Sequence, residues 1–67
     1  MIRIQVNGEA REVTEALTID ALLRSLELHP RMIVVEHNGD ILRRDRYDEV
    51  RIADGDALEL VHFVGGG

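Results

Sequence analysis

A short apolar alternation followed by an Asn-Gly dipeptide is the feature of this sequence that most restricts its fold. Residues 2–6 carry apolar side chains at every second position, which predicts a strand with one buried face. Asn7 and Gly8 follow, and this dipeptide best tolerates the positive φ angles of a type I′ turn. Residues 9–13 are therefore expected to return as the second strand of a hairpin. Their weaker alternation and their charged side chains suit the edge of a sheet.

The residues after this hairpin predict a helix. Thr18 is the expected N-cap, and Asp20 in the first turn complements the helix dipole. The apolar residues that follow have the i, i+3, i+4, i+7 spacing of an amphipathic helix: Ile19, Leu22, Leu23 and Leu26. Pro30 disfavours helical geometry at His29, so we expect a helix of about ten residues that covers one face of the sheet.

The middle of the chain predicts two more strands and a loop. Residues 32–35 are apolar at successive positions, which is typical of a strand in the middle of a sheet or of one with a second surface in contact. Asn38 and Gly39 predict another turn, followed by a short strand at residues 41–42. The charged residues 43–49 are expected to form a loop, in which Tyr47 packs its ring and leaves its hydroxyl in water.

The last strand is expected at residues 58–61, after a turn at residues 54–56. Its alternation points Leu58 and Leu60 toward the core, and Glu59 and Val61 away from it. A hairpin, one helix and further strands predict an α+β fold, in which one main helix packs on one face of a small mixed sheet. With the first and last strands in the middle, this is the β-grasp arrangement of ubiquitin-like domains.

Three consecutive glycines end the chain. Gly65, Gly66 and Gly67 lose more backbone entropy on ordering than any other triplet, and they stand at a terminus. We therefore expect a β-grasp domain over residues 1–64 and a flexible glycine tail over residues 65–67 that ends in a free carboxylate. Such a tail suits insertion into the narrow active site of another protein, because glycine permits close approach of the backbone to a ligand. The alternative is a frayed end, or a remnant of an expression vector.

Composition and motif spacing disfavour several classes of function. With 67 residues the chain has one modest core, which argues against an independent enzyme with its own substrate pocket. The net charge of −5 disfavours binding to nucleic acid or to an anionic membrane. His29, His37 and His62 lack metal-ligand spacing, and no glycine-rich loop opens a helix, so we expect neither a metal site nor an ATP site. The sequence has no cysteine, no signal-peptide pattern and no long apolar run, which predicts a cytoplasmic protein.

Three stretches of sequence carry a resemblance to a known family. They are the run Val34-Val35-Glu36-His37-Asn38-Gly39-Asp40-Ile41, the turn Asp54-Gly55-Asp56, and the ending Val61-His62-Phe63-Val64-Gly65-Gly66-Gly67. Together they resemble the thiamine-biosynthesis sulfur carrier proteins (ThiS) along the whole chain. A terminal diglycine alone would be less specific, since ubiquitin and molybdopterin-synthase small subunits share it. The chain departs from the family in having three glycines where two are sufficient.

The resemblance implies a carrier that acts through its terminal carboxylate and is not itself an enzyme. The carboxylate of Gly67 would be adenylated by an ATP-dependent activating enzyme, an adenylyltransferase. It would then become a thiocarboxylate with sulfur relayed from a cysteine desulfurase, and it would donate that sulfur to thiazole synthase. Gly65 and Gly66 would form the slim neck before the reacting residue. The chain would bind no cofactor of its own, because the partner uses the ATP.

The residues just before the glycines are the expected partner-binding surface. Phe63 is the only phenylalanine, and aromatic anchors are enriched in interface hot spots. Val61 and Val64 add a local apolar patch, and His62 lies between them and can contact the partner. The alternative is that Phe63 folds back onto the chain's own sheet. We expect a monomer when the chain is free.

Acidic side chains on the body of the protein have two readings. Glu36, Asp40 and Glu59 can steer docking to a basic enzyme surface, or they can simply be solvated charges, which is the more common case for any one of them.

Other functions remain open from the residues alone. A molybdopterin-type sulfur carrier would use the same chemistry. A ubiquitin-like protein modifier would join Gly67 to lysines through an isopeptide bond. A β-grasp interaction domain would need no free terminus, although the acidic balance and the glycine end count against it.

Overall fold

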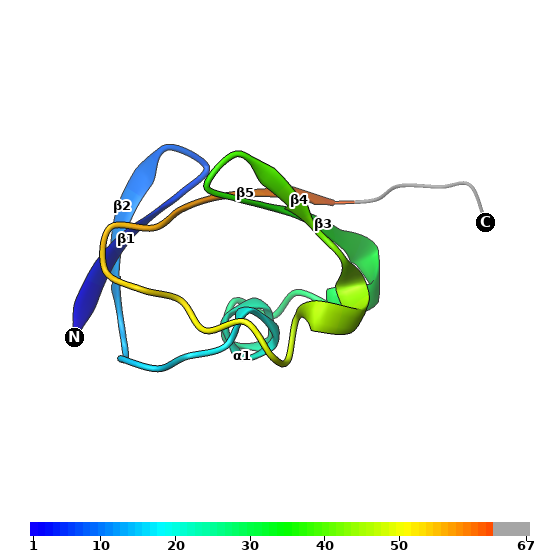
Figure 1. Ribbon diagram of the computed structural model, residues 1–67, viewed down its shortest axis with the longest axis horizontal. Coiled ribbons are helices and arrows are strands. Elements are labelled where there is room, and N and C mark those ends of the chain that lie inside the picture. Colours follow the sequence, from blue (N-terminus) through cyan, green and yellow to red (C-terminus); the bar gives the residue numbers. More distant parts are fainter. Residues whose placement is uncertain (63–67) are drawn as a thin grey trace.

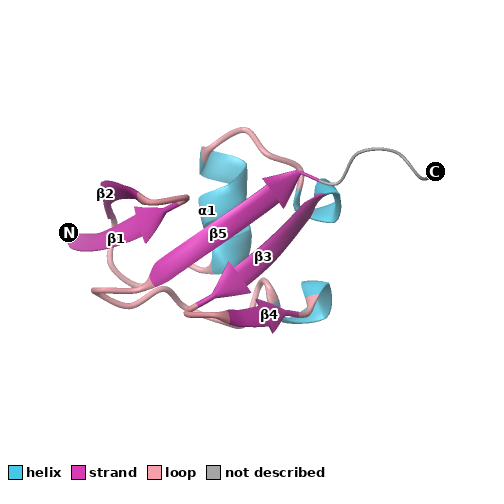
Figure 2. Cartoon of the chain, turned by 90° about the horizontal axis from the view of Figure 1, so that it is seen from above, coloured by secondary structure: helices cyan, strands magenta, loops and turns pink. Residues whose placement is uncertain are grey.

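Residues 1–62 form a mixed five-stranded sheet with one α-helix against one face, as Figures 1 and 2 show. The computed structural model describes residues 1–62. The elements along the chain are β1 (Ile2–Val6), β2 (Glu9–Val13), α1 (Ile19–Ser25), the 3₁₀ turn η1 (Pro30–Met32), β3 (Ile33–His37), β4 (Asp40–Leu42), the 3₁₀ turn η2 (Arg44–Arg46) and β5 (Ala57–His62). The strand order is β2-β1-β5-β3-β4. The first and last strands are parallel neighbours, while every other pairing is antiparallel, so the predicted mixed sheet is confirmed.

Both predicted Asn-Gly turns are present. Asn7 and Asn38 have φ angles of 52° and 53°, and the glycines after them have φ angles of 84° and 90°. The first turn closes the hairpin with Val6 opposite Glu9, and β2 lies at the edge of the sheet as predicted. The second turn joins β3 to β4, so β3 lies between β5 and β4.

The helix begins where the sequence predicts and ends earlier. The Thr18 hydroxyl oxygen accepts a hydrogen bond from the Ala21 N–H at 3.1 Å, which is the expected N-cap. The α-helix has seven residues rather than about ten. Glu27 takes a left-handed φ of 62°, and the Leu28 N–H bonds to the Leu23 carbonyl while the Glu27 N–H bonds to the Arg24 carbonyl. This is a Schellman ending, which terminates the helix before Pro30 can do so.

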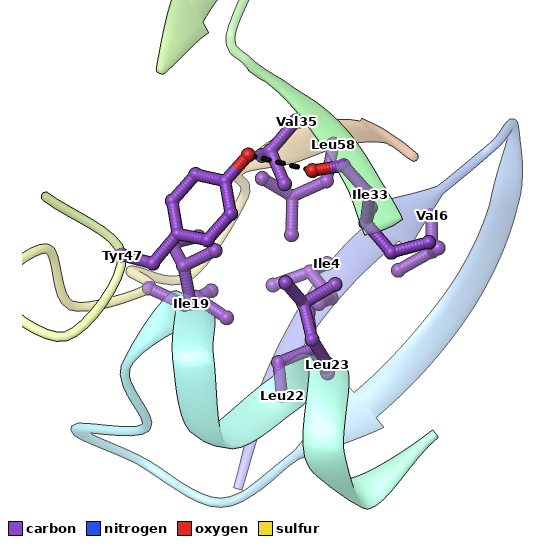
Figure 3. Close-up of a cluster of buried hydrophobic side chains, with 10 residues drawn as sticks. Ile4, Val6, Ile19, Leu22, Leu23, Ile33, Val35, Tyr47 and Leu58 are labelled. Carbon is purple, nitrogen blue, oxygen red and sulfur yellow. Dashed lines mark hydrogen bonds between the residues drawn. The ribbon is translucent and has the colours of Figure 1, made fainter. Parts of the chain in front are cut away.

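The core lies between the helix and the sheet, and Figure 3 shows nine of its ten side chains with labels. Buried side chains come from α1, from the inner faces of three strands and from the loop between β4 and β5: Ile4, Val6, Ile19, Leu22, Leu23, Ile33, Val35, Tyr47, Ile52 and Leu58. The predicted burial of Leu58 is confirmed, and Leu60 packs partly buried beside this cluster.

The prediction that Tyr47 leaves its hydroxyl in water is wrong. The whole residue is 3% exposed, and its hydroxyl donates a hydrogen bond of 2.8 Å to the carbonyl of Ile33, drawn as a dashed line in Figure 3. The physical reason is the path of the loop, which places the ring over the core and brings the hydroxyl to the start of β3. A buried hydroxyl needs a partner, and this carbonyl supplies it.

Candidate functional site

The predicted partner-binding residues that the structure describes lie at the C-terminal end of β5. Glu59 and Val61 are exposed, in agreement with the predicted alternation, and Val61 keeps 59% of its surface accessible. His62 is exposed as well. The other predicted site residues lie outside the described residues: Phe63, Val64, Gly65, Gly66 and Gly67. The predicted boundary between a domain and a glycine tail lies there too. The roles assigned to these five residues therefore stay predictions.

An exposed apolar patch extends from Val61 across β3 to β4, on the face of the sheet that α1 does not cover. Val34 on β3 lies directly opposite Val61 and is 38% exposed. Ile41 on β4 lies opposite Glu36, which places it diagonally from Val34, and it is 67% exposed. We call Val34, Ile41 and Val61 the outer patch. Apolar side chains gathered in this way on a small protein are typical of an interaction surface.

Two carboxylates adjoin the outer patch. Glu36 and Glu59 are directly opposite each other on β3 and β5, a position in which like charges destabilise a sheet. Within residues 1–62, neither carboxylate forms an ion pair. Both residues were predicted from the sequence to be candidates for steering the chain to a basic partner. The register shows that they lie side by side.

A hydrogen-bonded cluster around Asp56 was missed at the sequence level. Asp56 is 8% exposed, and its carboxylate accepts hydrogen bonds from the His37 ring nitrogen at 2.8 Å, the Asn38 amide at 3.0 Å and the Ala53 N–H at 2.8 Å. Burial acts to raise the pKa of Asp56, but these donors outweigh it and leave the pKa below its ordinary value.

This cluster lies at the start of β5, at the other end of the strand from His62. It links the turn between β3 and β4 to the turn before β5 by hydrogen bonds, so we interpret the cluster as stabilising the fold. The predicted turn at Asp54-Gly55-Asp56 is present, with Gly55 at a φ of 88°. His37 is partly buried, and its ring bonds to Asp56.

Two further properties bear on function. Within residues 1–62 the structure contains no group of three or more histidine, cysteine, aspartate or glutamate residues arranged to hold a metal ion. In that same part of the chain, no helix has the length and apolar character needed to cross a membrane.

A small mixed sheet that holds one helix, with its first and last strands side by side near the middle, defines the β-grasp class of ubiquitin-like proteins. Comparison with known proteins refines this class. The sequence profile of the ThiS family matches residues 4–67. The chain is 42% identical over 65 residues to the sulfur carrier protein ThiS of Bacillus subtilis, which covers 96% of this chain and 98% of that protein. The chain therefore belongs to the ThiS family.

A solved structure supports the same assignment. The crystal structure of a thiamine biosynthesis protein (ThiS) from Geobacter metallireducens superimposes with a TM-score of 0.85 and 36% sequence identity. The match covers 98% of this chain and 100% of that chain. Both the predicted family and the predicted ubiquitin-like β-grasp fold are confirmed.

Some relatives are much longer. The chain is 39% identical over 66 residues to a protein named thiazole synthase from Paramagnetospirillum magneticum, and it spans 98% of its own length but 20% of that protein. A second thiazole synthase, from Magnetococcus marinus, is 35% identical over the same share of both chains. A segment similar to this chain therefore occurs within thiazole synthases.

Proposed function

We propose that this chain is a sulfur carrier of thiamine biosynthesis that carries sulfur on the carboxylate of Gly67. The observation that supports this most directly is the family match, which extends through residue 67 and accompanies 42% identity to a sulfur carrier protein over nearly the full length of both chains. The fold supports it as well, because β5 is the middle strand of the sheet and its last residue, His62, precedes the first of the glycines by three positions. The chain acts as a co-substrate and not as an enzyme.

The chemistry needs two steps at the terminal carboxylate. A carboxylate oxygen attacks the α-phosphorus of ATP in the active site of an adenylyltransferase, which forms an acyl adenylate and releases pyrophosphate. Sulfur from a cysteine desulfurase, reduced to the level of sulfide by a thiol that is itself oxidised to a disulfide, then attacks the acyl carbon and AMP leaves, which yields the thiocarboxylate. In this proposal the partner holds the ATP, and the carrier acts in the cytoplasm.

The glycines determine how this carboxylate reaches the partner's active site. Three residues span at most about 11 Å, enough to bring a carboxylate into a narrow channel while the folded body stays outside. Gly65 and Gly66 add no side chain to that channel. The β-grasp body, monomeric when free, supplies the surface on which the partner docks.

The outer patch is the surface that we assign to partner docking. Val61 is part of the strand that leads into Phe63 and Val64, so a partner that receives Gly67 also meets Val61 and His62. Glu36 and Glu59 beside the patch favour a partner with basic side chains. The occurrence of a similar segment within thiazole synthases supports thiazole synthase as the acceptor of the sulfur.

Intact mass spectrometry tests the proposed function. The chain is incubated with ATP, a ThiS-activating adenylyltransferase and a sulfide source, and a mass gain equal to replacement of one oxygen by sulfur is expected at the C-terminal residue. A variant with one alanine added after Gly67 is expected to gain no sulfur. The terminal carboxylate is then displaced by one residue relative to the folded body, and the terminal residue has a methyl side chain. The matched control adds the same alanine before Met1 and is expected to load normally. Loading of the C-terminally extended variant at the normal rate would refute the role of Gly67.

A further inference from the structure

The side chain of Asn7 continues the pairing between β1 and β5 after the backbone of β1 has turned away. The parallel register covers Gln5 opposite Ala57 and Val6 opposite Leu58, and the Asn7 N–H donates to the Leu58 carbonyl at 2.9 Å. In an uninterrupted parallel ladder, the next bonds would join the Leu60 N–H to the carbonyl of residue 7, and the N–H of residue 9 to the Leu60 carbonyl.

Both of these bonds are made by the carboxamide of Asn7 instead. Its Oδ1 accepts from the Leu60 N–H at 2.7 Å, and its Nδ2 donates to the Leu60 carbonyl at 3.3 Å. One side chain thus takes the place of a peptide group and extends the ladder along β5. We call this pair of bonds the Asn7 clamp.

The clamp requires asparagine at this position. The left-handed φ of 52° that forms the hairpin turn also carries the backbone away from β5, and asparagine adopts this conformation more readily than most residues. Glycine would keep the turn and remove both bonds. Aspartate would keep the acceptor for the Leu60 N–H but has no donor for the Leu60 carbonyl.

Leu60 depends on this clamp because of its direction in the sheet. In a strand the N–H and carbonyl of one residue point to the same side, and those of the next residue point to the other side. The N–H and carbonyl of Leu60 point toward β1, where Asn7 bonds them, while those of Glu59 and Val61 point toward β3. Leu60 lies two positions before His62, the last residue of β5, and the segment 63–67 follows.

We propose that Asn7 is a positioning residue for sulfur loading, acting through its clamp on the end of β5. This inference rests on the proposed function. The activating enzyme must receive Gly67 and dock on Val61 and His62 at the same time, so these residues have to be held in register with the rest of the sheet. Loss of the clamp leaves the fold and the pairing of β5 with β3 intact but removes the bonds to Leu60 on the β1 side, which loosens the last part of the strand and weakens productive docking.

Asn7→Gly tests the proposal through two measurements. Amide hydrogen exchange at Leu60 is expected to accelerate about tenfold, since a lost hydrogen bond of typical strength opens the site to that extent. In the loading reaction with ATP, adenylyltransferase and sulfide, the KM for the carrier is expected to rise about fivefold while kcat stays near that of the wild type. Asn7→Asp is expected to lie between glycine and asparagine in both measurements, because it retains the bond to the Leu60 N–H.

The second Asn-Gly turn provides a matched control. Asn38 has nearly the same φ as Asn7, and its Oδ1 accepts from the Ala57 N–H at 2.8 Å, so it holds the start of β5 as Asn7 holds the end. Asn38→Gly is expected to destabilise the fold and to speed exchange at Ala57, with an unchanged KM for loading.

The outcomes separate the two hypotheses. A wild-type chain that gains no sulfur refutes the proposed function itself. A wild type that loads, together with an Asn7→Gly variant whose KM is unchanged although Leu60 exchanges faster, refutes only the positioning role. An equal rise in KM for Asn7→Gly and Asn38→Gly also refutes it, because general loss of stability then explains both.

Discussion

Replacing Tyr47 by phenylalanine removes one buried hydrogen bond and almost nothing else. The ring remains among the core side chains, so no cavity forms, while the Ile33 carbonyl loses the hydroxyl that lies 2.8 Å away. Ile33 is 1% exposed, which limits access of water to that carbonyl. Leaving a buried acceptor without its partner costs about 1–3 kcal/mol.

This loss is large for a protein of this size. A domain of 67 residues is expected to have a free energy of unfolding of roughly 3–10 kcal/mol. At about 4–8 °C for each kcal/mol, Tyr47→Phe is expected to lower Tm by roughly 5–20 °C. Urea denaturation followed by far-ultraviolet circular dichroism measures the difference, since the chain has no tryptophan and the variant loses its only tyrosine.

The pH dependence provides a second, independent readout. Burial raises the pKa of the Tyr47 phenol above its ordinary value of 10.0. Above pH 10.0 the unfolded chain therefore loses this proton while the folded chain retains it, so stability falls as pH rises through that range. The phenylalanine variant lacks this part of the decline. A variant as stable as the wild type at neutral pH, with the same alkaline profile, would refute the reasoning.

Three further predictions concern the turn before β5, the outer patch and the helix. Asp56→Asn is expected to remove an acid-sensitive part of the stability. A carboxyl whose folded pKa is lowered stabilises the fold above its unfolded pKa of about 3.8, and this contribution is lost as pH falls through the folded pKa. Acid titrations of Tm for both proteins measure the difference, and identical profiles would contradict it. Val61→Ser is expected to weaken binding to the activating enzyme about tenfold with little change in Tm, since Val61 is exposed, and calorimetric titration checks this. Equal affinity of the variant and the wild type would rule out Val61 as a contact. Thr18→Ala removes the hydroxyl that accepts from the Ala21 N–H and is expected to cost about 1 kcal/mol in urea denaturation, so an unchanged midpoint would argue against this cap.

The elements that could be predicted from the sequence are those set by neighbouring residues. Both Asn-Gly turns form because asparagine and glycine accept positive φ whatever surrounds them. Thr18 caps the helix for an equally local reason, and the apolar alternation fixed which face of β5 is buried. The end of the helix was not predictable in this way, because Glu27 has no strong preference for the left-handed conformation that it adopts.

The contacts that escaped prediction join residues far apart in the chain. Tyr47 meets Ile33 across 14 positions, and Asn7 meets Leu60 across 53. Asp56 collects donors from two separate segments. Such pairs depend on how the elements pack, which no local pattern encodes. The proposed function depends most on Gly67, and its sulfur-carrying role could be assigned only through the resemblance to the ThiS family, whereas residue chemistry alone suggested that Phe63 docks and that the glycines enter a narrow site.

Each of the two asparagines forms a local turn and also makes a long-range hydrogen bond to β5. At each Asn-Gly turn the left-handed asparagine directs its carboxamide back to β5: Asn38 reaches Ala57 at the start of the strand, and Asn7 reaches Leu60 near its end. Glycine at either position would satisfy the turn equally well, so turn geometry alone does not explain asparagine. The requirement for a side chain that both accepts and donates does explain it at Asn7, where both kinds of bond go to one residue of β5. The strand that leads to Gly67 is therefore held at both ends by the loops that the sequence makes easiest to predict.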